Sequence, residues 1–331
     1  MRPRDLVKQL ALILGAGMPV MMKGAPGIGK TDLGHQVAAM LEADLLVTHP
    51  VVSDPTDFKG LPGLIKGKAE FLPFGDLRQM LEATRRTIVM IDDIGQAPLV
   101  VQAAVMQLIL ARRINGHAVS EHVTFLACTN RREDRAGVTA ILEPVKSRFA
   151  TILELTVDVD DWCEWALDND MPTELIAFIR FRPDLLMATG TPTNDIVNRA
   201  CPRTVANVGR LMSIGCRDFE VLEGAAGKGF ATELLAFLKV WEAMPSIDGI
   251  LLDPAGAEVP TDPAAMYAVV MALASRATAT NGARIMKYAR RLRKEYALLL
   301  ARDAVRRCPE FTNNRDYIAW AVENQELLVG K

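Results

Sequence analysis

The octapeptide GAPGIGKT at residues 24–31 restricts the fold of this chain more than any other feature. A glycine, four free positions and then Gly29, Lys30 and Thr31 form a pattern typical of loops that enclose phosphate groups. Glycine reaches backbone angles closed to other residues, and it lets peptide N–H groups come close to phosphate oxygens. The candidate phosphate-binding residues are Gly24, Ala25, Pro26, Gly27, Ile28, Gly29, Lys30 and Thr31.

The neighbours of this loop fit the same interpretation. Residues 19–22 are apolar and predict a strand, and residues 31–41 predict a helix with an apolar face. A helix N-terminus attracts anions, which supports a phosphate site between the strand and the helix. In this setting Lys30 is expected to contact the β- and γ-phosphates, and the Thr31 hydroxyl to be a ligand of Mg²⁺.

Strands and helices alternate through the first half of the chain. Four further segments predict strands and two predict the helices between them: 44–52, 87–92, 123–128 and 151–155 for the strands, 76–85 and 98–112 for the helices. Such alternation predicts a parallel, doubly wound αβα sandwich, whose ligand sites lie at the carboxyl ends of the strands.

Two short hairpins are expected outside this sheet. Within the insertion at residues 53–77, Gly67 separates two short apolar stretches that can pair. Asn115 and Gly116 predict a second tight turn, near residues 113–121. Phe71 and Phe74, in the first hairpin and after it, are candidates for touching a substrate, although packing is the favoured interpretation.

The chain changes character after Asp158, where no strong strand pattern follows. Amphipathic helices are expected at 230–241 and 285–299, and a segment rich in Pro, Gly and Asp, 246–262, separates them. We therefore expect three domains: a nucleotide-binding αβα core at 1–156, a helical lid at 157–245 and a helical C-terminal extension at 246–331.

Polar side chains follow two of the expected strands. Asp92 suits the shell of a Mg²⁺ ion and Asp93 is placed to polarise an attacking water. The alternative is that both acids cap the next helix, but the phosphate loop upstream favours catalysis. Asn130, or its neighbour Thr129, is expected to face the γ-phosphate; a Thr-Asn pair by itself is more often a turn.

The composition of the chain argues against several classes of protein. The net charge of −2 gives no general attraction to DNA or anionic membranes, and the apolar run at 264–274 is too short to span a bilayer. Five cysteines without paired spacing predict neither a disulfide framework nor a zinc site, which fits a reducing cytosol. Arg2 and Arg4 precede an apolar run, but we expect no cleaved signal, because its removal would take away the first strand.

An ordered set of motifs resembles the AAA+ ATPases: GAPGIGKT, IVMIDD, ACTN, KSRF at 146–149 and CPRT at 201–204. The TDFKGLPGL and FLPFGDL segments of the insertion look like the MoxR branch, which includes relatives of the Rubisco-activase type. The resemblance extends from about Leu6 to Leu211.

This resemblance implies an ATPase that uses ATP and Mg²⁺ and forms a ring, most often a hexamer, with ATP between neighbouring subunits. Arg148 matches the arginine finger that reaches the neighbour's γ-phosphate, and Arg203 matches the sensor arginine of the lid. Without the family, both would be interpreted as surface arginines. The competitors for the finger role are Arg131, Arg132 and Arg135.

The leading functional hypothesis is an ATP-driven remodeller or chaperone of a protein partner. MoxR-type proteins commonly act with a von Willebrand factor A protein, whose metal site needs a DxSxS pattern; this chain has none, so such a module must come from another chain.

Three alternatives remain open. A nucleic-acid motor or loader is supported by the basic residues between Arg284 and Lys294, but an apolar stripe opposite them favours a solvated or subunit-facing side. A low-turnover ATP switch is motivated by Asp93, where the family usually has the longer Glu. A small-molecule kinase would leave the sensor strand, the KSRF motif and the helical lid unexplained.

Overall fold

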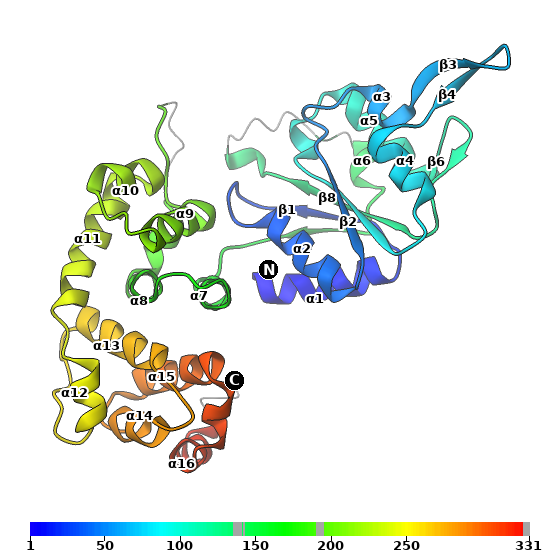
Figure 1. The fold of residues 1–331 in the computed structure, drawn as a ribbon. Coiled ribbons are helices and arrows are strands. Elements are labelled where there is room, and N and C mark those ends of the chain that lie inside the picture. The colour runs from blue at the N-terminus through cyan, green and yellow to red at the C-terminus, as the bar shows by residue number, and fades with distance from the viewer. Residues whose placement is uncertain (135–140, 142, 190–194, 327–331) are drawn as a thin grey trace. The chain divides into compact units, whose positions relative to one another are not determined.

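The computed structural model describes residues 1–134, 141, 143–189 and 195–326. The chain divides into two compact units, Met1–Asp158 and Val159–Lys331, which Figure 1 draws together. The expected end of the first domain, at residue 156, lies two residues before this boundary. The further division at 245–246 stays a prediction.

A five-stranded sheet forms the centre of the first unit. Its strands, in chain order, are β1 (Val20–Lys23), β2 (Asp44–Thr48), β5 (Thr87–Ile91), β8 (Val123–Thr129) and β9 (Thr151–Glu154). They are arranged as β2-β5-β8-β1-β9, and each adjacent pair is parallel. The expected parallel αβα fold is therefore confirmed.

Helices cover both faces of this sheet (Figure 1). They are α1 (Pro3–Gly15), α2 (Lys30–Met40), α3 (Pro55–Lys59), α4 (Gly75–Glu82), α5 (Leu99–Ala111) and α6 (Glu143–Lys146), with 3-10 turns at Ile94–Gln96 and Arg132–Asp134. Val105 of α5 and Phe125 of β8 lie in the main apolar core of the unit. Strand β2 ends at Thr48 instead of residue 52, because Pro50 has no N–H for a ladder bond.

Both expected hairpins are present. The first pairs β3 (Leu61–Ile65) with β4 (Lys68–Leu72), and the second pairs β6 (Arg113–Ile114) with β7 (His117–Ala118). Lys66 and Gly67 both have positive φ, as do Asn115 and Gly116. Two-residue turns of this kind match the natural twist of the flanking strands.

All regular elements among the described residues of the second unit are helices or 3-10 turns. Its elements are α7 (Val159–Asp168), α8 (Thr173–Phe181), α9 (Pro202–Ser213), α10 (Phe219–Ala226), α11 (Lys228–Glu242), α12 (Ile247–Leu252), α13 (Pro263–Ser275), α14 (Gly282–Ala289), α15 (Lys294–Arg307) and α16 (Arg315–Glu323), with 3-10 turns at Pro183–Leu186 and Pro309–Asn313. Arg180 of α8 makes a buried ion pair with Asp303 of α15. Helices on both sides of residue 245 are thus joined.

The expectation of a single helix at 285–299 is wrong, because this segment contains parts of two helices, α14 and α15. The segment between α14 and α15 leaves the helical path, and Arg293 has extended backbone angles. Arg291 there donates to the carbonyl oxygens of Pro254 and Ala257, while Leu292 is buried in the local core. Tertiary contacts therefore break a helix that the local apolar pattern would continue.

Candidate nucleotide site

The loop between β1 and α2 depends on its glycines. Gly27 and Gly29 have φ values of 75° and 94°, which side-chain-bearing residues rarely adopt. At Gly24 a β-carbon would lie 3.0 Å from the carbonyl oxygen of Leu155 and 2.6 Å from the Ile28 side chain. The loop therefore needs glycine at Gly24 for space, and at the other two positions for backbone conformation.

Lys30 begins α2 and its side chain folds back into the loop. Its Nζ donates to the carbonyl oxygens of Gly24 at 3.0 Å and Ala25 at 2.9 Å. It also donates to Asn130 Oδ1 at 2.6 Å. The residue is only 8% exposed, so the positive charge is held inside the loop by oxygen atoms.

Two oxygen-bearing side chains meet beside this lysine. The Thr31 hydroxyl donates to Asp92 Oδ2 at 3.2 Å, and the Asp92 backbone N–H donates to Thr48 O at the end of β2. Oxygen donors of this kind are the ones Mg²⁺ prefers. The oxygen donors of Thr31 and Asp92 are of a kind that fits a magnesium ion, and their role as its ligands stays a prediction.

Asp93 follows in an uncommon conformation. Its φ of 55° places it in the left-handed region, where a non-glycine residue is infrequent and clusters at functional sites. Its Oδ1 accepts a hydrogen bond of 3.0 Å from Asn130 Nδ2. The Asn130 amide thus joins the lysine of the loop to the second acid.

The residues at the end of β8, beside these groups, are buried. Cys128, at the end of β8, is fully buried, and burial together with the nearby Asp92 carboxylate raises the pKa of its thiol well above the usual value. Thr129 and Asn130 are 4% and 7% exposed. Charge–charge interactions are strengthened where water is excluded.

The candidate arginines are held in different ways. Arg131 donates to both carboxylate oxygens of Asp134, at 2.9 and 2.8 Å, and to Glu154 Oε1 at 3.4 Å. The Asp134 hydrogen bonds are the main cause that raises the pKa of Arg131 further above its ordinary value. The guanidinium of Arg131 is therefore engaged by carboxylates of its own unit. This makes Arg131 a weaker candidate for the arginine finger than Arg148.

Arg148 is half-buried in the turn after α6, and its buried Nε has no hydrogen-bond partner among the residues that the structure describes. Arg203 is exposed in the first turn of α9, in the second unit. Of the other competitors, Arg132 is exposed and Arg135 lies outside the described residues. Within the first unit, the structure therefore brings together Lys30, Asn130 and Asp93, and it places Thr31 beside Asp92.

A charged cluster at the sheet edge was not foreseen from the sequence. Lys23 Nζ lies 2.9 Å from Glu154 Oε2, and Glu154 also contacts Arg131. Lys23 is the main cause of the lowered pKa of the Glu154 carboxyl. The register that pairs Lys23 with Glu154 joins strands far apart in the chain, so no local signal could reveal it.

Among the residues described, no helix is long and apolar enough to cross a membrane. In the same part of the chain, no three or more His, Cys, Asp or Glu side chains gather as a metal-binding group.

Several solved structures are similar to this chain in fold. They include the Thermotoga maritima RuvB Holliday junction branch migration motor, at 18% identity and a TM-score of 0.44, covering 82% of this chain and 81% of that one. Another is NtrX from Brucella abortus in complex with ADP, at 13% identity and a TM-score of 0.44, covering 98% and 68%.

No curated protein matches the sequence significantly. A family model does match, over residues 19–149, and it describes an AAA domain of the dynein-related subfamily. This segment runs from β1 to the end of the KSRF motif and contains Lys30, Asp92, Asp93 and Asn130. The first unit of the chain therefore has the P-loop αβα fold of the AAA+ ATPases, and residues 19–149 are similar to the AAA domain of the dynein-related subfamily.

Proposed function

We propose that this protein is a Mg²⁺-dependent ATPase that uses hydrolysis to remodel a protein partner, in the manner of the MoxR branch. The observation that carries the proposal is one hydrogen-bonded group at the carboxyl ends of β1, β5 and β8. In it Asn130 joins Lys30 to Asp93, and Thr31 contacts Asp92. A structural cap on a helix would not require the lysine of a phosphate loop in the same cluster.

The proposed binding role rests on the loop. Its N–H groups and the start of α2 favour an anion, and Lys30 is already positioned at the loop by its contacts with carbonyl oxygens. Thr31 and Asp92 would hold Mg²⁺, which when bound would neutralise phosphate charge.

The proposed hydrolytic role belongs to Asp93 and Asn130. Asp93 would orient and polarise a water molecule, while the Asn130 amide fixes the carboxylate through Oδ1. The shorter side chain of Asp93 supports a slower turnover than a Glu would give, because catalysis is sensitive to displacements of about 1 Å.

Assembly into a ring, most often a hexamer, is part of the proposal. Arg148 would act on the nucleotide of a neighbouring subunit, and Arg203 would report nucleotide binding to the helical lid. The protein partner would be a separate chain, with a von Willebrand factor A protein as the candidate.

Phosphate release from ATP, with and without Mg²⁺, tests the proposal directly. We expect Lys30→Ala to abolish nucleotide binding, because the loop loses its only lysine. Asp93→Asn should keep binding and lower the hydrolysis rate by about 10²-fold or more, because the amide is a poor base. Lys8→Ala, an exposed lysine of α1, is the control and should behave as wild type. Wild-type protein that neither binds nor hydrolyses ATP would remove the proposed function.

A further inference from the structure

The β3–β4 hairpin carries apolar side chains on both of its faces. By its register, Leu61, Leu72 and Ile65 lie on one face, and Phe71 and Leu64 lie on the other. All five are exposed, from 37% for Ile65 to 80% for Leu64. Phe71, which we interpreted from the sequence as a packing residue at a helix or strand boundary, is 41% exposed.

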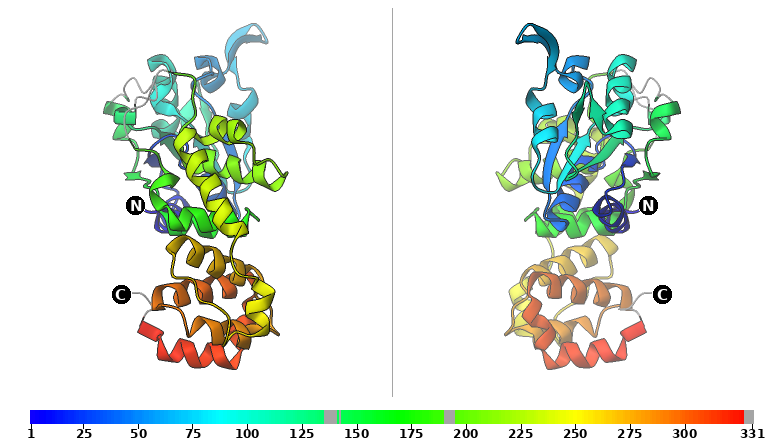
Figure 2. Two further views of the ribbon diagram at one scale, coloured as in Figure 1. Left: turned by 90° about the vertical axis from the view of Figure 1, so that its left-hand side faces the viewer. Right: turned by 90° about the vertical axis from the view of Figure 1, so that its right-hand side faces the viewer.

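This exposure is unusual for the architecture. A two-stranded hairpin by itself is marginally stable in water, and an antiparallel sheet ordinarily hides one apolar face. Figures 1 and 2 show the hairpin extending away from the rest of the first unit, so that neither face is covered at the tip. An apolar element in this state is typical of a surface that another chain covers.

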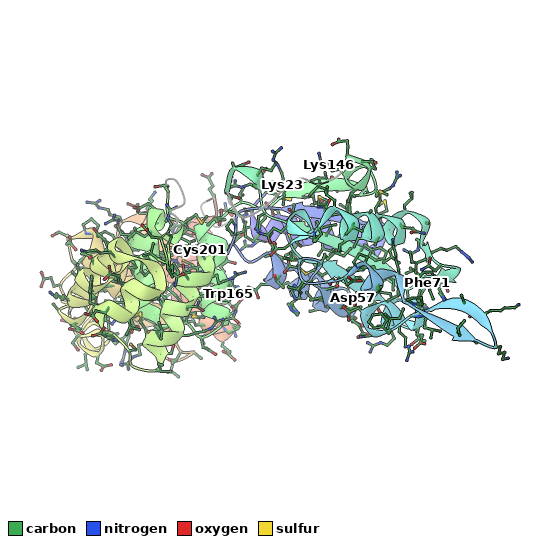
Figure 3. All side chains as sticks on the ribbon, turned by 90° about the horizontal axis from the view of Figure 1, so that it is seen from above. Lys23, Asp57, Phe71, Lys146, Trp165 and Cys201 are labelled. Atoms are coloured by element: carbon green, nitrogen blue, oxygen red, sulfur yellow. The ribbon has the colours of Figure 1, made fainter. Side chains whose placement is uncertain are left out.

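The base of the hairpin is nevertheless firmly attached. Asn115 Nδ2 donates to Lys59 O at 2.7 Å, and His117 Nε2 lies 3.1 Å from Phe71 O. Gly60 has a φ of 88°, and a β-carbon there would lie 2.9 Å from Leu72 O, so the strands close tightly at this end. Figure 3 shows Phe71 near this base. The second hairpin therefore holds the base of the first one in a defined position.

The charges at the tip indicate what can cover it. Lys66 and Lys68 flank Gly67 and are both exposed, whereas Glu70 is the one acidic residue of the two strands and their turn. Exposed lysines on strand edges oppose pairing between identical hairpins. They attract carboxylates, so charge complementarity favours an acidic chain over a second copy of this one.

We propose that the β3–β4 hairpin is a docking surface for an extended, acidic segment of the protein partner, with aliphatic side chains alternating with carboxylates. The segment pairs with the hairpin as a further strand. Its aliphatic side chains cover either Leu64 and Phe71 on one face or Leu61, Ile65 and Leu72 on the other. This inference rests on the proposed function, because it names the chemistry of the partner that ATP hydrolysis would act on.

A labelled 12-residue peptide of alternating Glu and Leu provides the test, with the full chain as receptor and fluorescence anisotropy as the readout. We expect saturable binding that weakens as salt is added. The double variant Lys66→Glu with Lys68→Glu should weaken it at least about tenfold, and Leu64→Ser at least about fivefold. A matching peptide of Lys and Leu should bind the wild type poorly and the double variant better.

Two control variants change equally exposed residues of the second unit. Leu252→Ser removes an 83% exposed leucine, and Arg284→Glu with Lys287→Glu reverses two exposed cations of α14. Neither should alter peptide affinity. Basal ATP hydrolysis should be the same in all these variants, because none of the changed residues belongs to the hydrogen-bonded group of Lys30, Thr31, Asp92, Asp93 and Asn130.

Three outcomes would overturn the docking surface: equal binding of the two peptides by wild type, equal effects of Leu64→Ser and Leu252→Ser, or a Leu64→Ser protein that sediments as a smaller assembly. The last outcome would assign the hairpin to contacts between copies. Peptide binding without any ATP hydrolysis would instead contradict the proposed ATPase function and still support the docking surface.

Discussion

Lys30 and Asn130 lie 100 positions apart in the chain, yet the lysine Nζ donates to the asparagine Oδ1 at 2.6 Å. The same amide donates to Asp93, so one side chain orders the cation of the phosphate loop and the acid beside it. Because a bound phosphate would compete for the same lysine, this contact connects nucleotide binding to the position of Asp93.

The role of Asn130 can be tested by Asn130→Ala. We expect ATP affinity to change little and the hydrolysis rate to fall by about 100-fold, since the acid loses the group that orients it. Stopped-flow binding of a fluorescent ATP analogue and phosphate release separate the two effects. The matched control is Asn169→Ala, whose amide donates to Trp165 O within the second unit. Equal turnover in both variants would contradict the orienting role.

The finger role of Arg148 predicts complementation between subunits. Arg148→Ala alone should bind ATP and assemble but lose about 10³-fold in rate. Mixed with Lys30→Ala protein, it should regain activity, because the second protein supplies an intact arginine to the first one's intact loop. Arg132→Ala, an exposed neighbour in sequence of Arg131, should hydrolyse ATP normally. No recovery in the mixture would show that Arg148 does not act across a subunit border.

Breaking the buried ion pair between Arg180 and Asp303 should destabilise the second unit strongly. Their side chains are 7% and 5% exposed, and Arg180 Nη2 lies 3.0 Å from Asp303 Oδ1. Asp303→Ala should lower the free energy of unfolding by about 3–5 kcal/mol, because it leaves a buried guanidinium unpaired. Urea denaturation measures this. Asp184→Ala, which removes the exposed partner of Arg182, should cost less than about 1 kcal/mol.

Thiol reactivity should separate buried from accessible cysteines. Burial raises the pKa of Cys163 to about 12, so its thiol stays protonated in the folded chain at a pH of about 8.5. We expect iodoacetamide to modify Cys201, Cys216 and Cys308 in the native protein and to reach Cys128 and Cys163 only after unfolding. Mass spectrometry counts the adducts. Native modification of Cys163 at the rate of Cys201 would contradict this burial.

The raised pKa of Cys163 also predicts how stability depends on pH. An unfolded cysteine thiol, with its ordinary pKa of 9.0, loses its proton in a range where the folded Cys163 thiol keeps it. The folded state therefore binds more protons between about pH 9 and 12, and stability falls as the pH rises through this range. A Cys163→Ala variant should show a smaller decrease over the same range when its unfolding free energy is measured.

The phosphate loop, the parallel strands and both hairpin turns could be predicted from the order of residues along the chain. These features depend on local requirements: glycine where φ is positive, apolar runs in buried strands, and Asn-Gly or Lys-Gly at tight turns. For the same reason Asp92 and Asp93 were recognisable, since they follow a strand that could be identified from its own residues.

The contacts between distant segments became visible only in the folded chain. The break between α14 and α15, the engagement of Arg131 by Asp134 and Glu154, and the exposure of Phe71 all depend on which segments pack together. A helix pattern does not encode that Arg291 will bond to carbonyl oxygens of another loop. Local conformation follows from a few neighbouring residues, whereas burial and side-chain pairing follow from the whole fold.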